Sequence, residues 1–325
     1  MRCTRIIPIA WAAAAAVIGG CQGLNPAAQR EENVQVLMAE AEVFLQQGLT
    51  DSALAAFGLA LEENPRLLEA HLGMGHIYRS RGDYDLASRA YERAVETDPN
   101  SFQAHYYLAL VRQLMGQIEE AVRIYLRALT INPDSLEANR DLSSAYLQLG
   151  QAAQAIPYAL RATQIDPDNQ AAWCNLAAAY SLTGQYAQAV DAYRQAAELG
   201  ELADPVLLGL ADAHIHLDNY QQAINVLELL IRRSPSSTAH ERLGLALFKM
   251  RRFEEALAQY RQAQQLDAQD TAALNGVGVC LMTLYLQGNR EDHSLRDEAL
   301  EAWRQSLLLE PDQPRIIDLL ARFGR

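Results

Sequence analysis

The 325-residue chain lacks the short motifs that mark most catalytic sites. It has no glycine-rich phosphate loop, no nucleophile elbow and no Cys-x-x-Cys pair. The segment from Arg290 to His293, with Asp297 nearby, is the one cluster suited to a metal, but its spacing matches no zinc or calcium frame. We therefore expect no enzymatic activity, no cofactor and no metal.

The chain is also poor in positive charge. It has 27 basic and 40 acidic residues, and Lys249 is its sole lysine. The formal charge is -13, and removal of residues 1–20 would delete Arg2 and Arg5 and bring it to -15. Such a surface disfavours nucleic acid and anionic lipid, so we expect no nucleic-acid partner.

Cysteine is scarce, with four residues in the whole chain. Cys174 and Cys280 are separated by more than a hundred residues and, in the repeat register described below, by three repeats. That separation exceeds the roughly 7 Å between Cα atoms that a disulfide tolerates. Both are predicted to be buried or half-buried thiols.

No apolar run in the N-terminal region is long enough to span a bilayer. Residues 6–18 are largely apolar, whereas a spanning helix needs roughly 20 apolar residues. Arg2 and Arg5 precede this run and small residues follow it, which is the order of an export signal. We expect a signal peptide over residues 1–20.

The sequence Ile18-Gly19-Gly20-Cys21 resembles the lipobox of bacterial lipoproteins. The resemblance implies that the signal is cut before Cys21 and that a diacylglycerol is attached to its thiol. More than one acyl chain makes such anchoring stable. The expected location is the periplasm-facing side of the bacterial envelope, and Gln22 favours the outer membrane. The alternative is a plain secretory signal with an incidental cysteine.

Internal repeats dominate the rest of the chain. Three residue types recur every 34 residues: Gly48, Gly82, Gly116, Gly150 and Gly184; Pro65, Pro99, Pro133 and Pro167; Ala53, Ala87, Ala121, Ala155, Ala189 and Ala223. The alanine series continues at Ala256 and Ala299 after a deletion and an insertion. A fixed period of this length predicts a stacked array of small structural units.

Residues 68–101 show what one unit contains. Residues 68–78 have helical apolar spacing, and Gly82 supplies a left-handed position that ends the first helix. A second helix is predicted over residues 84–95 and must stop before Pro99. Each unit therefore reads as a pair of amphipathic helices.

This pattern resembles the tetratricopeptide repeat, or TPR. The family's marker positions are matched by Trp173, Leu176, Ala177, Tyr180, Gly184, Ala189, Tyr193 and Ala196. The resemblance implies an all-α, right-handed superhelical solenoid over residues 34–312. About eight units would start at residues 34, 68, 102, 136, 170, 204, 237 and 271.

Three further segments complete the expected organisation. Residues 21–33 are predicted to form a tether, and nine extra residues in the eighth unit predict a long exposed loop within 288–297. Residues 313–325 are expected to form a capping helix. Its apolar residues Ile316, Ile317, Leu320 and Phe323 would cover the last unit.

The resemblance also suggests where partners bind. In TPR proteins the first helices line a concave groove that takes peptides or partner helices. The groove positions predicted to form a basic-aromatic patch here are His76, Arg79, Tyr106, Gln113 and Arg140. The alternative is a solvated helix face whose charges are balanced by nearby acids.

Two further sets of positions bear on partner binding and on catalysis. The carboxylate clamp of chaperone-binding members needs a lysine where this chain has Met38, so that mode is excluded. His71, His105 and His240 occupy the position of Trp173 and are interpreted as packing residues.

The sequence thus favours a non-enzymatic protein-interaction scaffold, lipid-anchored in the envelope, that assists assembly of an envelope, pilus or secretion complex. An alternative is a TPR subunit that recruits substrate or catalyst to a cell-wall or glycosyl-transfer enzyme complex. A third hypothesis, catalysis through the loop at His293, has the least support.

Overall fold

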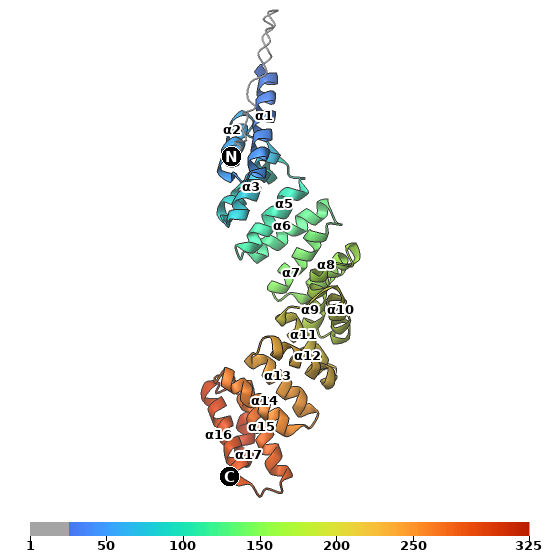
Figure 1. The fold of residues 1–325 in the computed structure, drawn as a ribbon, viewed down its shortest axis with the longest axis vertical. Helices are drawn as coiled ribbons and strands as arrows, with labels where there is room; N and C mark the ends of the chain where they lie inside the picture. Colours follow the sequence, from blue (N-terminus) through green and yellow to red (C-terminus); the bar gives the residue numbers. More distant parts are fainter. Residues whose placement is uncertain (1–25, 325) are drawn as a thin grey trace, which may run out of the picture. The chain divides into compact units, whose positions relative to one another are not determined.

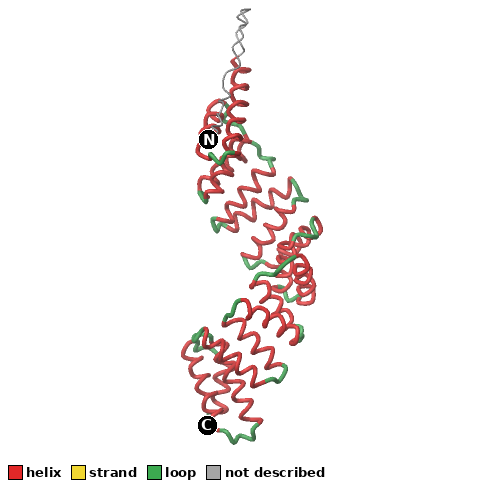
Figure 2. The backbone as a smooth tube through the Cα atoms, viewed as in Figure 1, coloured by secondary structure: helices red, strands yellow, loops and turns green. Residues whose placement is uncertain are grey.

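The computed structural model describes residues 26–324, which fall into two compact units divided between Thr97 and Asp98. The predicted signal peptide over 1–20 and the lipid site at Cys21 lie outside the described residues. Over residues 26–324 the regular structure consists of 17 α-helices, with no strand (Figure 2). The predicted all-α class is confirmed.

Unit 1 contains two helix pairs, in which α1 packs on α2 and α3 on α4. Their bounds are α1 (Pro26–Gln46), α2 (Thr50–Glu63), α3 (Leu68–Arg81) and α4 (Tyr84–Thr97). A core of Ala41, Ala53, Phe57, Ala70 and Ile77 joins α1, α2 and α3.

Unit 2 continues with six helix pairs and a final single helix (Figure 1). The helices are α5 (Phe102–Leu114), α6 (Ile118–Ile131), α7 (Leu136–Gln148), α8 (Ala152–Ile165), α9 (Gln170–Leu182), α10 (Tyr186–Leu199), α11 (Asp204–His216), α12 (Tyr220–Arg233), α13 (Ser237–Lys249), α14 (Phe253–Leu266), α15 (Thr271–Gln287), α16 (His293–Leu309) and α17 (Pro314–Phe323). Each first helix packs on its own second helix, and each second helix packs on the next pair. The first helices of pairs begin at 68, 102, 136, 170, 204, 237 and 271, where the sequence register places a new unit.

The periodic glycines form the turns inside the pairs. Gly48, Gly82, Gly116, Gly150 and Gly184 have positive φ angles between 69° and 81°. At Gly82 the backbone N–H groups of Gly82 and Asp83 donate to the carbonyls of Arg79 and Tyr78, which satisfies the end of α3. The left-handed conformation predicted for Gly82 is confirmed.

The periodic alanines lie at the contacts between helices within each unit. All eight have no exposed surface: Ala53, Ala87, Ala121, Ala155, Ala189, Ala223, Ala256 and Ala299. A glycine is needed where a ring lies still closer, because a Cβ at Gly75 would be 2.4 Å from Tyr91 Cε1. The small residues therefore let the helices approach while buried tyrosines fill the space between them.

In four repeats, a hydrogen bond that the sequence pattern did not predict links a turn to the helix that follows it. His71 and His105 donate through Nε2 to the carbonyls of Pro65 and Pro99, each at 3.0 Å. Asn139 and Trp173 make the same bond to Pro133 and Pro167, at 2.9 and 2.8 Å. In these four repeats the residue at this position supplies a side-chain N–H donor. Later repeats do not keep the bond, because Leu207 and Leu274 have no donor and His240 bonds to Gln259 instead.

The predicted tether is partly wrong. Helix α1 begins at Pro26, so residues 26–33 are helical and the first unit starts before residue 34. Proline is favoured in the first turn of a helix, and the alanine, glutamine, arginine and glutamate residues after it are strong helix formers.

The exposed loop predicted within 288–297 is present but shorter than expected. The connection between α15 and α16 spans only residues 288–292, because both helices are lengthened to 17 residues. Tyr285 and Leu295 lie on the added turns and pack into the C-terminal core. Burial of these side chains stabilises extra helix where a loop was expected.

The capping helix is present as α17, with one residue assigned to the wrong face. Ile316 is buried, and Leu320 and Phe323 pack against the same core. Ile317 is 49% exposed. Residues 316, 320 and 323 follow helical spacing, whereas 317 falls outside the buried stripe.

The two cysteines of the described chain are free, with Cys280 buried and Cys174 half-buried, as predicted. Burial raises the pKa of Cys174 and raises that of Cys280 to about 12, so both are protonated thiols at neutral pH. Among residues 26–324, no helix is long and apolar enough to cross a membrane.

Candidate functional site

The two candidate residues of unit 1 lie one turn apart on α3. His76 Nδ1 forms a 2.9 Å hydrogen bond with the Tyr91 hydroxyl, and the two rings meet edge to face. Burial, followed by the charge of Arg79, lowers the pKa of His76. His76 is therefore neutral at pH 7, and its ring nitrogen is used to position Tyr91 on α4.

The three candidate residues of unit 2 belong to one hydrogen-bonded region over α5, α6 and α7. The Tyr106 hydroxyl donates to Asp141 Oδ2 at 2.9 Å, and Arg140 Nε donates to Asp141 Oδ1 at 2.7 Å. Tyr125 donates to Gln113 Oε1 at 3.0 Å, and its ring lies 6.1 Å from that of Tyr106. We call these five residues the tyrosine network.

The tyrosine network is electrically balanced. Asp141, which the sequence analysis did not single out, pairs with Arg140 and raises the pKa of that guanidinium. Burial, and then Asp141, raises the pKa values of Tyr106 and Tyr125, so both phenols remain protonated. At Arg140 the predicted basic patch thus contains an ion pair with no net charge. That the patch binds a partner stays a prediction.

A second charged cluster lies further along unit 2, on α11 and α13. Arg242 Nε is 2.8 Å from Asp212 Oδ1, and Arg242 donates to Glu241 Oε2 at 2.7 Å. Glu241 is only 8% exposed. Burial raises the pKa values of both Glu241 and Asp212 even though Arg242 opposes the shift. We call these three residues the acidic cluster, because two carboxylates share one guanidinium.

A pocket of about 470 Å³ adjoins the acidic cluster. Asp212 lines it together with Leu182 from α9 and Tyr186 from α10, and Leu182 is 67% exposed. The Tyr186 and His216 rings stack at 4.2 Å along its wall. The pocket therefore joins an apolar and aromatic lining to one carboxylate.

Gly209 lets the Tyr193 hydroxyl approach α11 closely at the pocket wall. A Cβ at Gly209 would lie 2.4 Å from the Tyr193 hydroxyl oxygen, so any larger residue would push against that ring. Sequence reasoning missed Gly209 and Asp212 because neither belongs to the 34-residue glycine and alanine series. The available signal for Asp212 was the repeat register, because it lies four 34-residue repeats after the predicted groove residue His76.

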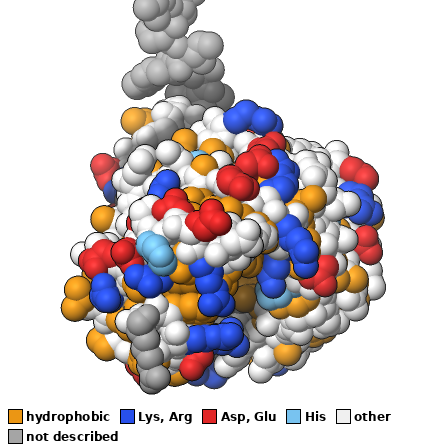
Figure 3. All heavy atoms as spheres, turned by 90° about the horizontal axis from the view of Figure 1, so that it is seen from below, with side chains coloured by type: hydrophobic (Ala, Val, Ile, Leu, Met, Phe, Trp, Pro, Cys, Tyr) orange, Lys and Arg blue, Asp and Glu red, His pale blue; other side chains and the backbone are white. Residues whose placement is uncertain are grey.

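The surface shows no field of one sign in the view toward the end of the chain that carries α17. Figure 3 shows arginine and lysine side chains interspersed with aspartate and glutamate, with hydrophobic atoms exposed between them. This face therefore presents no surface of a single charge sign to a partner.

The segment around His293 forms a helix start. Asp292 Oδ1 accepts the backbone N–H of Ser294 at 3.0 Å, and its hydrogen bonds with Ser294 lower its pKa. Within the described stretch from 26 to 324, no three His, Cys, Asp or Glu side chains are grouped to hold a metal ion. The residues of this segment are explained by capping of α16.

Comparison with known proteins identifies the repeat. A family model described as the cilia and flagella-associated protein 70 C-terminal domain, a TPR domain, matches residues 12–274. The chain belongs to this family of tetratricopeptide-repeat domains. No curated protein matches the chain in sequence.

Solved TPR structures share the fold at low sequence identity. A TPR protein from Parabacteroides merdae is 17% identical, with a TM-score of 0.53, over 77% of this chain and 99% of its own. PilF from Pseudomonas aeruginosa is 21% identical, with a TM-score of 0.54, over 65% and 96%. YrrB, described as a TPR protein with an unusual peptide-binding site, is 17% identical, with a TM-score of 0.50, over 60% and 96%. These similarities establish the TPR fold of this chain.

Proposed function

We propose that this TPR protein is a non-enzymatic scaffold that binds an extended segment of a partner protein along the first helices of unit 2. The observation that carries the proposal is the pocket beside the acidic cluster, where Leu182, Tyr186 and Asp212 converge from three helices. Successive first helices present side chains at regular intervals, which suits a linear ligand. The description of YrrB as a peptide-binding TPR protein supports the same mode.

The chemistry of the pocket favours a basic side chain with an apolar stem. The wall of Leu182 and the stacked Tyr186 and His216 rings can cover methylene groups. Two carboxylates and one guanidinium leave a local excess of negative charge at Asp212 and Glu241. A lysine or arginine of the partner would place its charge beside Asp212.

Site-specific crosslinking tests this surface. A photoreactive amino acid at Leu182 lies at the pocket, and the same group at Leu308, which is 83% exposed on α16, is the matched control. We expect a defined partner to be crosslinked from position 182, with a lower yield when Asp212→Asn is added. Equal yields from both positions, or no effect of Asp212→Asn, would contradict binding at the pocket.

We further propose that the protein is lipid-anchored at Cys21 in the bacterial envelope and assists assembly of an envelope, pilus or secretion complex. The support is the lipobox-like sequence from Ile18 to Cys21. Labelling with a radioactive fatty acid should mark the wild type and not Cys21→Ser, which should be released from membranes. An unlabelled wild type would refute the anchor. Crosslinking from Leu182 to a cell-wall hydrolase or a glycosyl transferase would instead favour the recruiting-subunit alternative.

A further inference from the structure

An arginine on the second helix of a pair bonds to the turn before that pair in two repeats of unit 2. Arg127 on α6 donates to Asn100 Oδ1 at 3.2 Å, and Arg161 on α8 donates to Asp134 Oδ1 at 2.5 Å. The two residues are 27 positions apart in both cases, and the acceptor directly follows the periodic proline. These two repeats thus share a contact between a guanidinium and an acceptor on the turn.

Unit 1 places two arginines in this register. The residue after Pro65 is Arg66, and the residue 27 positions later is Arg93 on α4. Arg93 instead pairs with Glu96 on its own helix at 2.6 Å, and both side chains are mostly exposed. Across residues 26–324, the Arg66 guanidinium has no hydrogen-bond or ion-pair partner, and only its backbone N–H is bonded, to Asn64.

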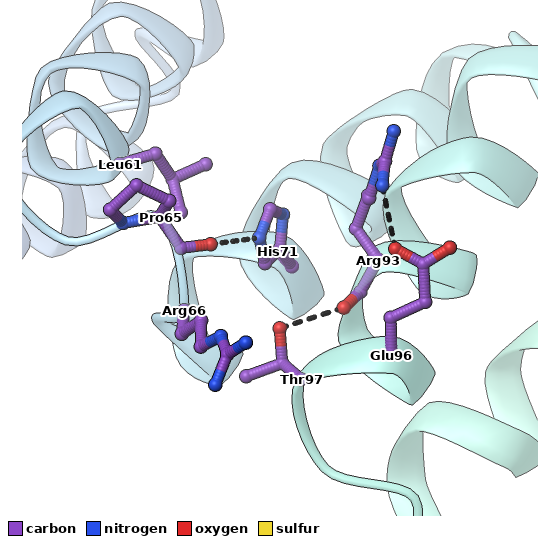
Figure 4. A pocket seen from close by; sticks show the side chains of 7 residues that line it. All are labelled: Leu61, Pro65, Arg66, His71, Arg93, Glu96 and Thr97. Atoms are coloured by element: carbon purple, nitrogen blue, oxygen red, sulfur yellow. Dashed lines mark hydrogen bonds and ion pairs between the residues drawn. The ribbon is translucent and has the colours of Figure 1, made fainter.

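A pocket of about 410 Å³ lies inside unit 1, beside Arg66 and Arg93 (Figure 4). Arg66, His71, Arg93, Glu96 and Thr97 provide its polar lining. His71 Nε2 and the Thr97 hydroxyl are already committed to the carbonyls of Pro65 and Arg93. The groups left to receive a ligand are therefore the two guanidiniums, whose combined charge the single carboxylate of Glu96 only half neutralises.

We propose that this pocket binds a phosphate group through Arg66 and Arg93. A guanidinium offers paired N–H donors that match phosphate geometry, and a dianion matches two guanidiniums where a single carboxylate does not. The exposed Arg93–Glu96 pair is a weak competitor, because ion pairs of this kind contribute little. The phosphate can be the free ion or a monoester on a lipid headgroup, and this site uses other residues than the peptide surface of unit 2.

Variants that copy the other repeats provide the test. Arg66→Asp recreates the arginine–aspartate pair of Arg161 and Asp134 and should lower the affinity for inorganic phosphate about tenfold, as loss of a charge-assisted bidentate contact implies. Asp134→Arg places a second guanidinium beside Arg161 and should add a second phosphate site. Titration calorimetry of the full chain at low ionic strength measures both, with far-ultraviolet circular dichroism to show that each variant is folded.

Glycerol phosphate, titrated in parallel, distinguishes the source of the ligand. Binding of both compounds indicates a phosphate carried on a larger molecule, and binding of inorganic phosphate alone indicates the free ion. Arg93→Gln should weaken both titrations without changing the fold. Absence of phosphate binding by the wild type, or equal affinities of the wild type and Arg66→Asp, would overturn the proposal.

Discussion

The repeats of α5–α10 and those of α11–α16 share a buried alanine seam but differ in the residues that form their turns. In the first group, turns use Gly116, Gly150 and Gly184. In the second group, Asp218 and Arg251 adopt the same left-handed conformation with φ angles of 57° and 62°. The comparison shows that the seam and the turn conformation define the fold, whereas the residue that adopts the turn can vary.

The same two groups differ in what they bury. The tyrosine network of α5–α7 is balanced, with Arg140 matched by Asp141. The acidic cluster of α11 and α13 holds two carboxylates whose pKa values are raised by burial. The repeats that depart most from the sequence pattern therefore carry the strained electrostatics, which is where a binding role is expected.

The largest effect should come from removing the central aromatic residue of each group. Trp303 and Tyr125 have no exposed surface, and Trp303 Nε1 donates to the Asn275 carbonyl. Trp303→Ala and Tyr125→Ala should each lower the free energy of unfolding by about 3–5 kcal/mol, because a large cavity is left. Hydrogen exchange should show lost protection mainly in α15–α17 for the first variant and in α5–α8 for the second. A uniform loss of hydrogen-exchange protection along unit 2 would contradict the view that each repeat is stabilised mainly by its neighbours.

A smaller effect should distinguish the two kinds of turn. Arg251→Gly removes a side chain from a left-handed position and should raise the free energy of unfolding by about 0.5–1 kcal/mol. Gly150→Ala is the matched opposite, because a Cβ there meets no atom within 4 Å and only the backbone is strained. Urea denaturation should give changes of opposite sign. Two changes of the same sign would show that the turn conformation is not what the repeats share.

Loss of one turn hydrogen bond should have an effect of about 0.5–1.5 kcal/mol, the usual contribution of such a bond. His105→Ala removes the donor to the Pro99 carbonyl, whereas His105→Asn keeps an N–H donor of the type that Asn139 supplies. We expect thermal unfolding to show a lower midpoint for the alanine variant and a nearly unchanged one for the asparagine variant. Equal losses would assign the role of His105 to ring packing.

The sequence alone was sufficient for the repeat, because its period depends on steric needs that few residues meet. Gly82 must reach a positive φ, and Ala87 must leave room for a neighbouring helix. The length of α15 and α16 was not predictable in this way, since burial of Tyr285 favours added helix only in the assembled core. Pairing of Arg140 with Asp141 and of Arg242 with Asp212 depends on side-chain directions that a linear period does not contain.

The smallest expected effect is a pH dependence of stability that comes from Glu241. Burial raises its pKa above the ordinary value of 4.5, against the opposing charge of Arg242 and with Asp270 and Asp212 adding to the rise. The folded chain thus holds this proton to higher pH than the unfolded chain does. The resulting contribution to the free energy of unfolding is largest at acidic pH and declines as the pH rises from about 4.5 through the folded-state pKa.

Glu241→Gln removes this titration, so the stability of the variant should decline less over this pH window than that of the wild type. Urea midpoints measured from about pH 4 to pH 8, with the exposed Glu254→Gln as control, check this. Parallel wild-type and Glu241→Gln curves would mean that burial does not raise the pKa of Glu241 in the folded chain. The contrast between the two groups of repeats would then lie in their turns alone.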